Sequence, residues 1–352
     1  MFEMERSSSS KTMERSSSYD NSSNGETYDA MERSSSNDNS PIASSSDEME
    51  DDLSPDDFLT GQFSPDRMKS FRIDKILGKG SFGTAYLATH LPTGRVCVVK
   101  KIQTTPETRD MSLHEAHVGM TVSSENVCKT IAYTEDSENV YIIMEYIEGM
   151  DLYEFITNKP GIFQKIPGLL LFVITKIVQG IRDFHEAGFV HGDIKPENIF
   201  IGLSQDKMEI TCVKLMDFGL SKPISEIGGH SAGTYDYLAP EIAKKELRDS
   251  KIDVWSCGIT IYAMFMMTLP SCIASKNPDK ELRRSDVLQN LRKLPTDKAP
   301  NLFKAMSTNP KYAMIQELII SALTVNPLHR PTPQELLEKV REISPHFQGK
   351  DS

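Results

Sequence analysis

The octapeptide HGDIKPEN, residues 191–198, brings a carboxylate, an ammonium and a carboxamide together in a very short stretch. Apolar residues flank it on both sides, with Phe189 and Val190 before it and residues 199–201 after it. The octapeptide is therefore expected to form a loop between two buried elements, where functional groups commonly lie.

The side chains of this loop suit phosphoryl transfer. Asp193 can accept the proton of an attacking hydroxyl, Lys195 can neutralise charge on the phosphoryl group, and Asn198 can ligate Mg²⁺ through oxygen. Because a single Asp in a loop is more often a turn former than a base, partners elsewhere in the chain must decide between these interpretations.

Residues 1–70 differ in composition from the rest of the 352-residue chain. They contain 6 Lys or Arg against 16 Asp or Glu, a net charge of −10, while the whole chain carries −11. The hexapeptide MERSSS begins at Met4, Met13 and Met31. A Ser-rich, acidic repeat cannot bury enough apolar surface to offset chain entropy, so residues 1–70 are predicted to be a disordered tail.

Several functional classes are disfavoured. Residues 71–352 are nearly neutral, which argues against a nucleic-acid partner. The five cysteines lack CxxC spacing, so neither a disulfide framework nor a zinc site is expected. The uncharged run 257–274 reaches the length of a membrane span, but Pro270 favours a buried core helix and no membrane association. Without a secretory signal, a cytoplasmic or nuclear location is expected.

A glycine-rich stretch, GKGSFGTAY at residues 78–86, follows an apolar segment that begins at Phe71. In dinucleotide-binding folds a helix follows such glycines at once. Here residues 84–90 and 95–102 are predicted to be strands, so the glycines belong to a hairpin. Backbone N–H groups of the hairpin can approach phosphates, and Lys100 on the second strand can pair with them.

Residues 109–121 are predicted to form a helix that carries Glu115. This carboxylate can orient Lys100 through an ion pair, although a solvated helix residue is an alternative. Residues 140–146 are predicted to be a buried strand, and a break at residues 148–149 to be a hinge between a β-rich and a helical lobe.

Beyond this hinge, residues 169–185 have apolar side chains at helical spacing. Residues 199–201 and 210–215 are predicted to form a hairpin that ends at Asp217. A carboxylate at this strand end, beside Asn198, completes a candidate magnesium site.

Taken in order, these motifs resemble those of the eukaryotic-type protein kinase family over residues 71–345. The set comprises GKGSFG, VCVVK ending at Lys100, Glu115, HGDIKPEN, DFG at 217–219, APE at 239–241 and DVWSCGI from Asp253. So many ordered motifs are far more specific than any one of them. Lys195 together with Gly233-Thr234 resembles the serine/threonine branch.

The resemblance implies an α+β, bilobal protein-kinase-like fold. A small β-rich N-lobe with one main helix is expected at 71–147, a larger, mainly α-helical C-lobe at 148–346, and a C-terminal tail at 347–352. The implied activity is Mg²⁺-dependent transfer from ATP to Ser or Thr hydroxyls of protein substrates.

The resemblance also assigns roles to individual residues. Asp193, Lys195, Lys100 and Glu115 are implied catalytic residues, and Asn198 and Asp217 are implied metal ligands. ATP contacts are implied for Leu77, Gly78, Lys79, Gly80, Ser81, Phe82, Gly83, Thr84, Ala85, Val98, Lys100, Met144, Glu145, Ile147 and Asp151. His191 and Phe218 match a hydrophobic spine, and Glu241 and Arg330 match a buried ion pair.

Two further acids bear on substrate choice. Asp151 and Glu197 lie where basic-directed kinases of the family carry acids. Substrates with Arg or Lys on the N-terminal side of the target residue are therefore expected.

Some residues depart from the family pattern. Gly192 replaces an arginine that in many relatives binds a phosphorylated activation loop. Activity is therefore expected without phosphorylation of Ser221, Ser225 or Ser231. Val98 replaces a smaller alanine, which is expected to narrow the adenine pocket.

Gly119 stands one turn after Glu115, where a bulky residue is usual. The helix is therefore expected to be poorly held until a regulatory partner binds it. The N-terminal tail is a second segment to which a regulatory partner could bind. Gly119 and Gly192 keep a scaffold or pseudokinase function open. A small-molecule kinase is disfavoured by the APE segment and the 253–259 motif.

Overall fold

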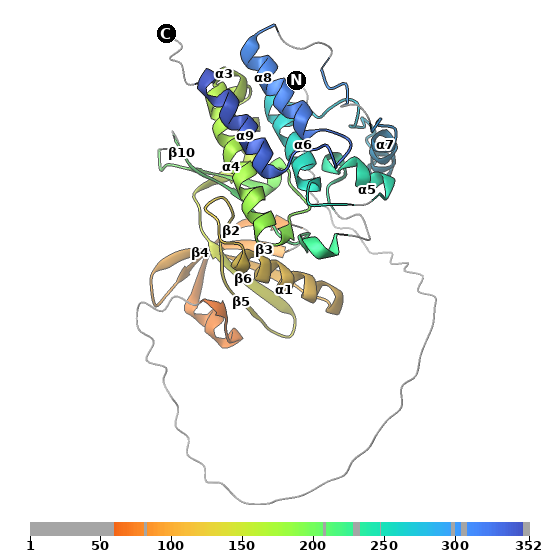
Figure 1. Cartoon of the computed structure of the whole chain (residues 1–352). Coiled ribbons are helices and arrows are strands. Elements are labelled where there is room, and N and C mark those ends of the chain that lie inside the picture. Colours follow the sequence, from red (N-terminus) through yellow and green to blue (C-terminus); the bar gives the residue numbers. More distant parts are fainter. Residues whose placement is uncertain are drawn as a thin grey trace, which may run out of the picture.

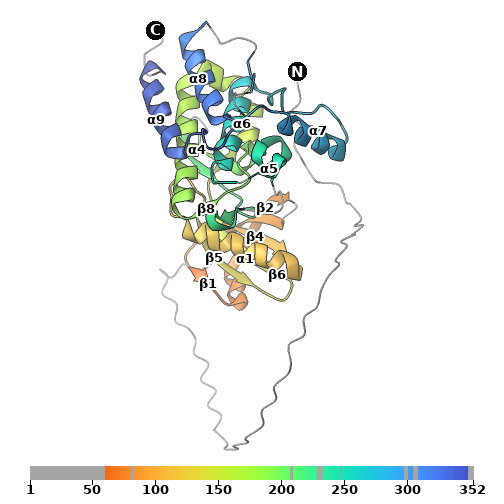
Figure 2. The same ribbon diagram turned by 45° about the vertical axis from the view of Figure 1, so that its right-hand side comes forward.

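The computed structural model describes residues 60–80, 83–206, 209–227, 233–246, 248–296, 300–303 and 308–347. These residues form two lobes of different secondary structure (Figures 1 and 2). One lobe is a β-sheet with a single long helix, and the other is mainly helical, so the predicted bilobal α+β fold is confirmed. The MERSSS repeats lie outside the described residues.

The N-lobe is built on one sheet with the strand order β1-β5-β6-β4-β3-β2. Neighbouring strands are antiparallel except for β1, which runs parallel to β5. The elements are β1 (Gly61–Gln62), η1 (Pro65–Ser70), β2 (Phe71–Gly80), β3 (Gly83–His90), β4 (Arg95–Gln103), α1 (Pro106–Thr121), β5 (Thr130–Glu135) and β6 (Asn139–Glu145). The predicted strands at 84–90 and 95–102 are confirmed as the antiparallel pair β3–β4. The glycines lie at the end of the neighbouring β2–β3 ladder, where Gly80 pairs with Gly83.

Each face of this sheet has its own apolar cluster, because side chains alternate along a strand. Ile102, Val140 and Ile142 point to one face and pack against Ala116 of α1. Residues on the opposite face form a second cluster, which comprises Phe63, Phe71, Ala88, Cys97, Val99, Ala132 and Ile143. Helix α1 therefore covers one face, and the segment before β2 covers part of the other.

The folded domain begins before Phe71. The sequence predicts a disordered tail as far as residue 70. The Phe63 N–H donates to Tyr133 O at 3.1 Å, and Thr134 Oγ1 donates to Phe63 O at 2.6 Å. The Phe63 ring packs 6.2 Å from the Phe71 ring. One short apolar anchor inside an acidic, Ser-rich region was too weak a signal to alter the predicted boundary.

Helix α1 begins at Pro106, earlier than the predicted residue 109. Thr105 caps it, because Thr105 Oγ1 accepts the Thr108 N–H and Thr108 Oγ1 accepts the Thr105 N–H. This reciprocal capping satisfies two N-terminal N–H groups, and proline is favoured at the first helical position.

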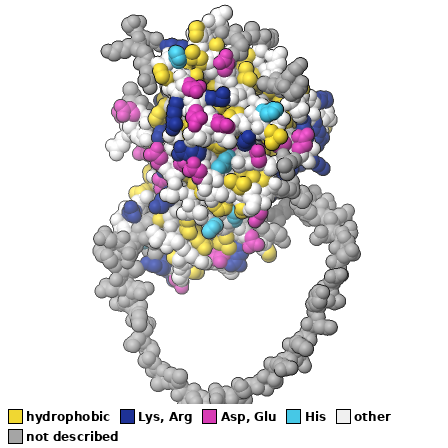
Figure 3. Space-filling model, in the orientation of Figure 1, with side chains coloured by type: hydrophobic (Ala, Val, Ile, Leu, Met, Phe, Trp, Pro, Cys, Tyr) yellow, Lys and Arg dark blue, Asp and Glu magenta, His cyan; other side chains and the backbone are white. Residues whose placement is uncertain are grey.

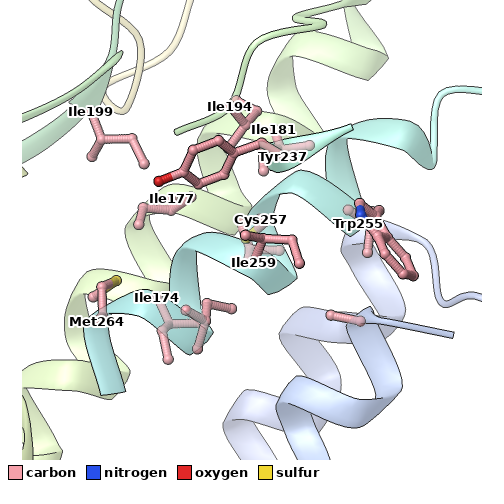
Figure 4. Packing of buried hydrophobic residues seen from close by; sticks show 14 of the residues in the cluster. Ile174, Ile177, Ile181, Ile194, Ile199, Tyr237, Trp255, Cys257, Ile259 and Met264 are labelled. Atoms are coloured by element: carbon pink, nitrogen blue, oxygen red, sulfur yellow. The ribbon is translucent and has the colours of Figure 1, made fainter. Parts of the chain in front are cut away.

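The C-lobe is arranged around α4 (Pro167–Glu186) and α6 (Ile252–Met266), which pack against each other. Figure 4 shows Ile174, Ile177 and Ile181 of α4 beside Cys257 and Ile259 of α6. The other elements are β7 (Gly149–Asp151), α2 (Leu152–Asn158), α3 (Ile162–Lys165), β8 (Phe189–Val190), η2 (Pro196–Asn198), β9 (Ile199–Leu203), β10 (Ile210–Leu215), β11 (Lys222–Pro223), η3 (Ile224–Glu226), η4 (Tyr235–Tyr237), α5 (Pro240–Lys244), α7 (Lys280–Arg292), α8 (Pro310–Ala322), α9 (Pro333–Ile343) and η5 (Ser344–Phe347).

Most of the uncharged run at 257–274 belongs to α6, whose side chains from Ile252 to Phe265 are buried. Its interpretation as a core helix is therefore confirmed. No helix among the described residues combines the length and apolar character that a membrane crossing requires.

Two further details concern the C-lobe. Strands β9 and β10 form the predicted antiparallel hairpin, and β7 pairs with β9 directly after the hinge. Phe347, expected in the C-terminal tail, instead packs against the C-lobe core, so the domain extends slightly past residue 346.

The anchor before β2 leads to a prediction about stability. Phe63→Ala is expected to lower the free energy of unfolding by about 3 kcal/mol, because it empties a buried aromatic site. Ile73→Ala is the control, since Ile73 is 48% exposed and its loss is expected to cost less than about 0.5 kcal/mol. Urea unfolding of both variants checks this, and equal midpoints would mean that residues 60–70 do not stabilise the domain.

Candidate active site

A buried carboxylate holds the start of the loop at 191–198 in place. Asp253, at the first turn of α6, accepts the His191 N–H at 2.8 Å and the Gly192 N–H at 2.9 Å. His185 Nε2 lies 2.9 Å from the same carboxylate. Burial opposes ionisation of Asp253, but its hydrogen bond with His185 and the other bonds outweigh burial and lower its pKa. The loop is therefore tied to the centre of the C-lobe.

Asp193 is held by hydrogen bonds to both of its carboxylate oxygens. Oδ1 accepts from the N–H and the hydroxyl of Thr234, each at 2.9 Å. Oδ2 accepts from Lys195 Nζ at 2.7 Å and from Asn198 Nδ2 at 2.9 Å. Burial acts to raise the pKa of Asp193, yet Lys195 and Thr234 lower it below its usual value. The carboxylate is consequently ionised at neutral pH and fixed in orientation.

Asn198 and Asp217 are neighbours through the backbone. The Met216 N–H donates to Asn198 O at 3.0 Å, which places the start of the DFG segment beside η2. Asp217 has a left-handed backbone with φ of 65°. The amide nitrogen of Asn198 is committed to Asp193, so its side-chain oxygen is the group that remains for a cation.

These two residues fit Mg²⁺. Among the described residues, no group of three or more His, Cys, Asp or Glu side chains is placed to hold a metal ion. Mg²⁺ is commonly held by one or two carboxylates together with substrate phosphates and water, so it does not need such a group. Asp217 and Asn198 supply one carboxylate and one amide oxygen, which suits a metal that arrives with a nucleotide.

Lys100 connects the N-lobe to this site. Its Nζ lies 2.6 Å from Glu115 Oε1 on α1 and 3.3 Å from Asp217 Oδ1. Burial would lower the pKa of Lys100, but the two carboxylates outweigh burial and raise the pKa above its usual value. The predicted Lys100–Glu115 ion pair is confirmed, and the lysine is a fixed cation beside the candidate metal ligands.

A cavity of about 660 Å³ opens between the glycine hairpin and the first half of α1. Residues predicted to bind ATP supply part of its wall, namely Lys79, Gly80, Gly83 and Thr84. Glu115 and Gly219 also line it, so it adjoins the Lys100 cluster.

Comparison with known proteins bears on this arrangement. Residues 71–340 match the model of the protein kinase domain, which covers more than half of the chain. This chain belongs to the protein kinase family.

Among the similar proteins are three kinases from distant organisms. The chain is 28% identical over 214 residues to an Aurora kinase of Eremothecium gossypii, and 31% identical over 206 residues to the serine/threonine-protein kinase Nek5 of Mus musculus. It is 30% identical over 212 residues to the SNF1-related protein kinase catalytic subunit alpha KIN12 of Arabidopsis thaliana. Each alignment covers 58% of this chain, but only 55%, 32% and 40% of the respective relatives. The chain thus spans only part of the length of these relatives.

Two predictions that came from the kinase resemblance concern packing. His191 and Phe218 are in contact, with ring centroids 5.9 Å apart, and both pack on Phe184. Glu241 and Arg330 form a fully buried ion pair with two hydrogen bonds, at 2.7 and 2.9 Å. The predicted ion pair is confirmed.

The packing at Gly119 argues against the expectation that this glycine leaves α1 poorly held. A Cβ at Gly119 would collide with Thr130 Oγ1 and would lie 3.0 Å from Phe218 Cε2. The volume that a bulky side chain would fill is already occupied by Thr130 and Phe218. The close approach that glycine allows therefore packs α1 directly on its neighbours, which removes this reason for expecting a partner on the helix.

The implied adenine-site residues lie on adjacent strands. Ala85 pairs with Lys100, and Val98 pairs with Met144, so these side chains share the sheet face that α1 covers. Leu77 and Gly78 belong to β2, while Ser81 and Phe82 lie outside the described residues.

Glu145 and Ile147 lie at and just after the end of β6. The Glu145 carboxylate also pairs with Lys214 at 2.8 Å. Asp151 caps α2, because its Oδ1 accepts the Glu154 N–H at 2.7 Å. This structural role stands beside the predicted contact with ATP.

Sequence reasoning missed two contacts that shape the site. The DVWSCGI motif gives no local signal that Asp253 holds the 191–198 loop. Sequence reasoning also missed His114, whose Nε2 lies 3.1 Å from Ser221 O. Both are contacts between a side chain and a distant backbone group, and periodicity gives no signal for them.

The contact at Gly119 can be tested with one small substitution. Gly119→Ala is expected to lower the free energy of unfolding by about 1–3 kcal/mol, because the added methyl overpacks the contact with Thr130 and Phe218. Gly168→Ala is the matched control in another helix, where the new Cβ would only make a 3.5 Å contact with Phe347 O. Thermal unfolding compares the two, and a stabilised Gly119→Ala would contradict this account of α1.

Proposed function

We propose that this chain is a serine/threonine protein kinase, which transfers the γ-phosphoryl group of ATP to Ser or Thr hydroxyls of protein substrates. The observation that carries the proposal is the convergence of Lys100, Asp193 and Asp217, from separate parts of the chain, on one site. Lys195, Asn198 and Glu115 hold these groups through hydrogen bonds and ion pairs. A pseudokinase reading is less favoured, because the set is both retained and assembled.

Each residue has a chemical task in this proposal. Asp193 accepts the proton of the attacking hydroxyl, for which its ionised and oriented carboxylate is suited. Lys195 contacts both Asp193 and Thr234, so its ammonium lies beside the acceptor position and offsets charge on the transferred group. Lys100 binds the nucleotide phosphates, and Glu115 positions it.

Asn198 and Asp217 are proposed to hold Mg²⁺, which when bound screens the charge of the phosphates. Leu77, Ala85, Val98 and Met144 are proposed to contact the adenine, and Val98 to narrow its pocket. The protein substrates, rather than small molecules, follow from the family to which the chain belongs.

Transfer of labelled phosphate tests the proposal directly. The purified chain with Mg²⁺ and labelled ATP is expected to label generic Ser or Thr peptides, and chelation of Mg²⁺ to stop the reaction. Asp193→Asn and Asp217→Ala are each expected to lower the rate by at least about 100-fold.

Asp66→Ala is the matched control, since Asp66 is an exposed carboxylate of η1, which packs on the sheet face opposite α1. It is expected to keep the wild-type rate. Unchanged melting temperatures would show that all variants are folded. Equal labelling by wild type and Asp217→Ala would refute the assignment of this site.

We also propose that activity does not require phosphorylation of the activation segment. Gly192 has φ of 77° and no side chain to bind a phosphate, and a Cβ there would lie 3.0 Å from Leu220 O. Ser221 is only 4% exposed, and its hydroxyl donates to Phe218 O at 2.6 Å. The start of the activation segment is thus held by contacts that involve no phosphate. Ser231 lies outside the described residues.

Alanine at Ser221, Ser225 and Ser231 together is expected to leave the transfer rate within about threefold of wild type. Loss of the buried Ser221 hydrogen bond is expected to lower the free energy of unfolding by about 1 kcal/mol. Ser225→Ala with Ser231→Ala is the control that leaves this bond intact. An inactive double variant would show that a phosphorylated segment is required.

Glu197 and Asp151 support a preference for basic substrates. Glu197 Oε2 is buried and has no hydrogen-bond partner among the described residues. A substrate donor can therefore satisfy it once the side chain turns toward the surface. Burial raises the pKa of the Glu197 carboxyl group. A cation placed beside it would lower this pKa again.

Peptides with Arg on the N-terminal side of the target Ser are expected to react faster than peptides with Ala there. Glu197→Gln is expected to reduce this preference about tenfold, since a charge-assisted hydrogen bond is lost. A peptide array that shows no preference for Arg or Lys would rule out this role.

A further inference from the structure

A second charged region lies next to the candidate acceptor site. Thr234 contacts Asp193, and the following residues form η4, which packs against α7. Tyr235 therefore directly follows a residue that contacts Asp193, and α7 lies against the same turn. Figure 3 shows Lys and Arg side chains gathered at the edge of the C-lobe that α7 occupies in Figure 1.

Two consecutive arginines of α7 contact η4 in different ways. Arg283 Nη2 lies 2.8 Å from Asp236 Oδ2, whose side chain is largely buried, so its charge is neutralised. The guanidinium of Arg284 stacks on the Tyr235 ring at 4.5 Å. The acidic neighbour of Arg284 is Glu281, whose Oε2 lies 4.0 Å from Arg284 Nη1 and whose side chain is 79% exposed. An ion pair this exposed contributes little stabilisation.

Arg284 is therefore a held cation whose charge is only weakly compensated. Contact with a tyrosine ring restrains the guanidinium and leaves N–H groups available to an anion. Carboxylates and phosphates match that edge with two parallel hydrogen bonds. Arg283 acts as a positioning residue, because its ion pair with Asp236 holds the turn that carries Tyr235.

The position of Arg284 determines which side of the target residue it can contact in a bound substrate. Glu197 lies in η2, which packs against α2, and Asp151 caps α2. Glu197 and Asp151 thus lie next to α2, whereas Arg283 and Arg284 lie on α7, which contacts η4. If a substrate runs its N-terminal residues along α2 and these acids, as proposed above, its C-terminal residues run along η4 toward Arg284.

We propose that Arg284, stacked on Tyr235 beside the acceptor site, selects protein substrates with an anionic residue on the C-terminal side of the target Ser or Thr. The anion is a carboxylate or a phosphate, which share the chemistry that a guanidinium recognises. This inference rests on the proposed kinase function for its substrate class, but it concerns residues outside the Lys100 and Asp193 cluster.

Three matched sets of peptides test the proposal. All carry Arg before one target Ser, and the positions after that Ser hold Ala, Glu or phosphoserine in turn, with a further set that holds Lys there for the charge-reversed variant. The wild type is expected to give kcat/KM about threefold to fivefold higher with Glu than with Ala, and about tenfold higher with phosphoserine. Arg284→Ala is expected to bring both ratios close to one, and Arg284→Glu to favour Lys at the same positions.

Lys280→Ala is the control, because it removes the same charge from α7 at a residue that is exposed and outside the contact with Tyr235. It is expected to keep the wild-type ratios. A wild type without anion preference, or a preference that survives Arg284→Ala, would overturn the inference.

Peptide affinity, measured by fluorescence anisotropy with Mg²⁺ and a non-hydrolysable ATP analogue, separates this inference from the proposed function. If no peptide is phosphorylated, the proposed function fails. The same Glu-to-Ala and phosphoserine-to-Ala ratios in affinity, with and without Arg284, still decide whether this residue binds the anion.

Discussion

The contact of Lys100 with Glu115 and Asp217 is the interaction on which the arrangement of the two lobes depends. A buried ammonium is stable only when it is paired, and removal of one partner from such a pair typically costs about 3–5 kcal/mol. Lys100 is on β4, Glu115 is on α1, and Asp217 follows β10 in the C-lobe. One charge requirement therefore ties three elements together, and it places the N-lobe cation beside the candidate metal ligands.

Two further buried carboxylates give the 191–198 loop its shape. Asp253 fixes the beginning of the loop through the N–H groups of His191 and Gly192. Asp193 fixes the end through Lys195 and Asn198. In each case the carboxylate satisfies donors that would otherwise be unpaired in the interior, which is costly. The loop is thus tied to the C-lobe by these two carboxylates, and the short helix η2 forms its last turn.

Gly119 and Gly192 are required for two different physical reasons. Glycine at position 119 is required for packing, because Thr130 and Phe218 occupy the space that a side chain would take. Glycine at position 192 is required by the backbone, because this residue adopts a left-handed conformation while its N–H donates to Asp253. A missing side chain can therefore reflect either a compensated contact or a required conformation, and only the neighbours in space distinguish the two.

The sequence by itself determined the bilobal fold class, the glycine hairpin, the main helices and the set of polar residues in the candidate site. It could do so because these features rest on local periodicity and on ordered motifs within short stretches. The tertiary structure alone decided the start of the domain at the Phe63 anchor, the tight packing at Gly119 and the stacking of Arg284 on Tyr235. Each of these depends on contacts between residues far apart in the chain, whose energies arise from burial and charge pairing that no local pattern encodes.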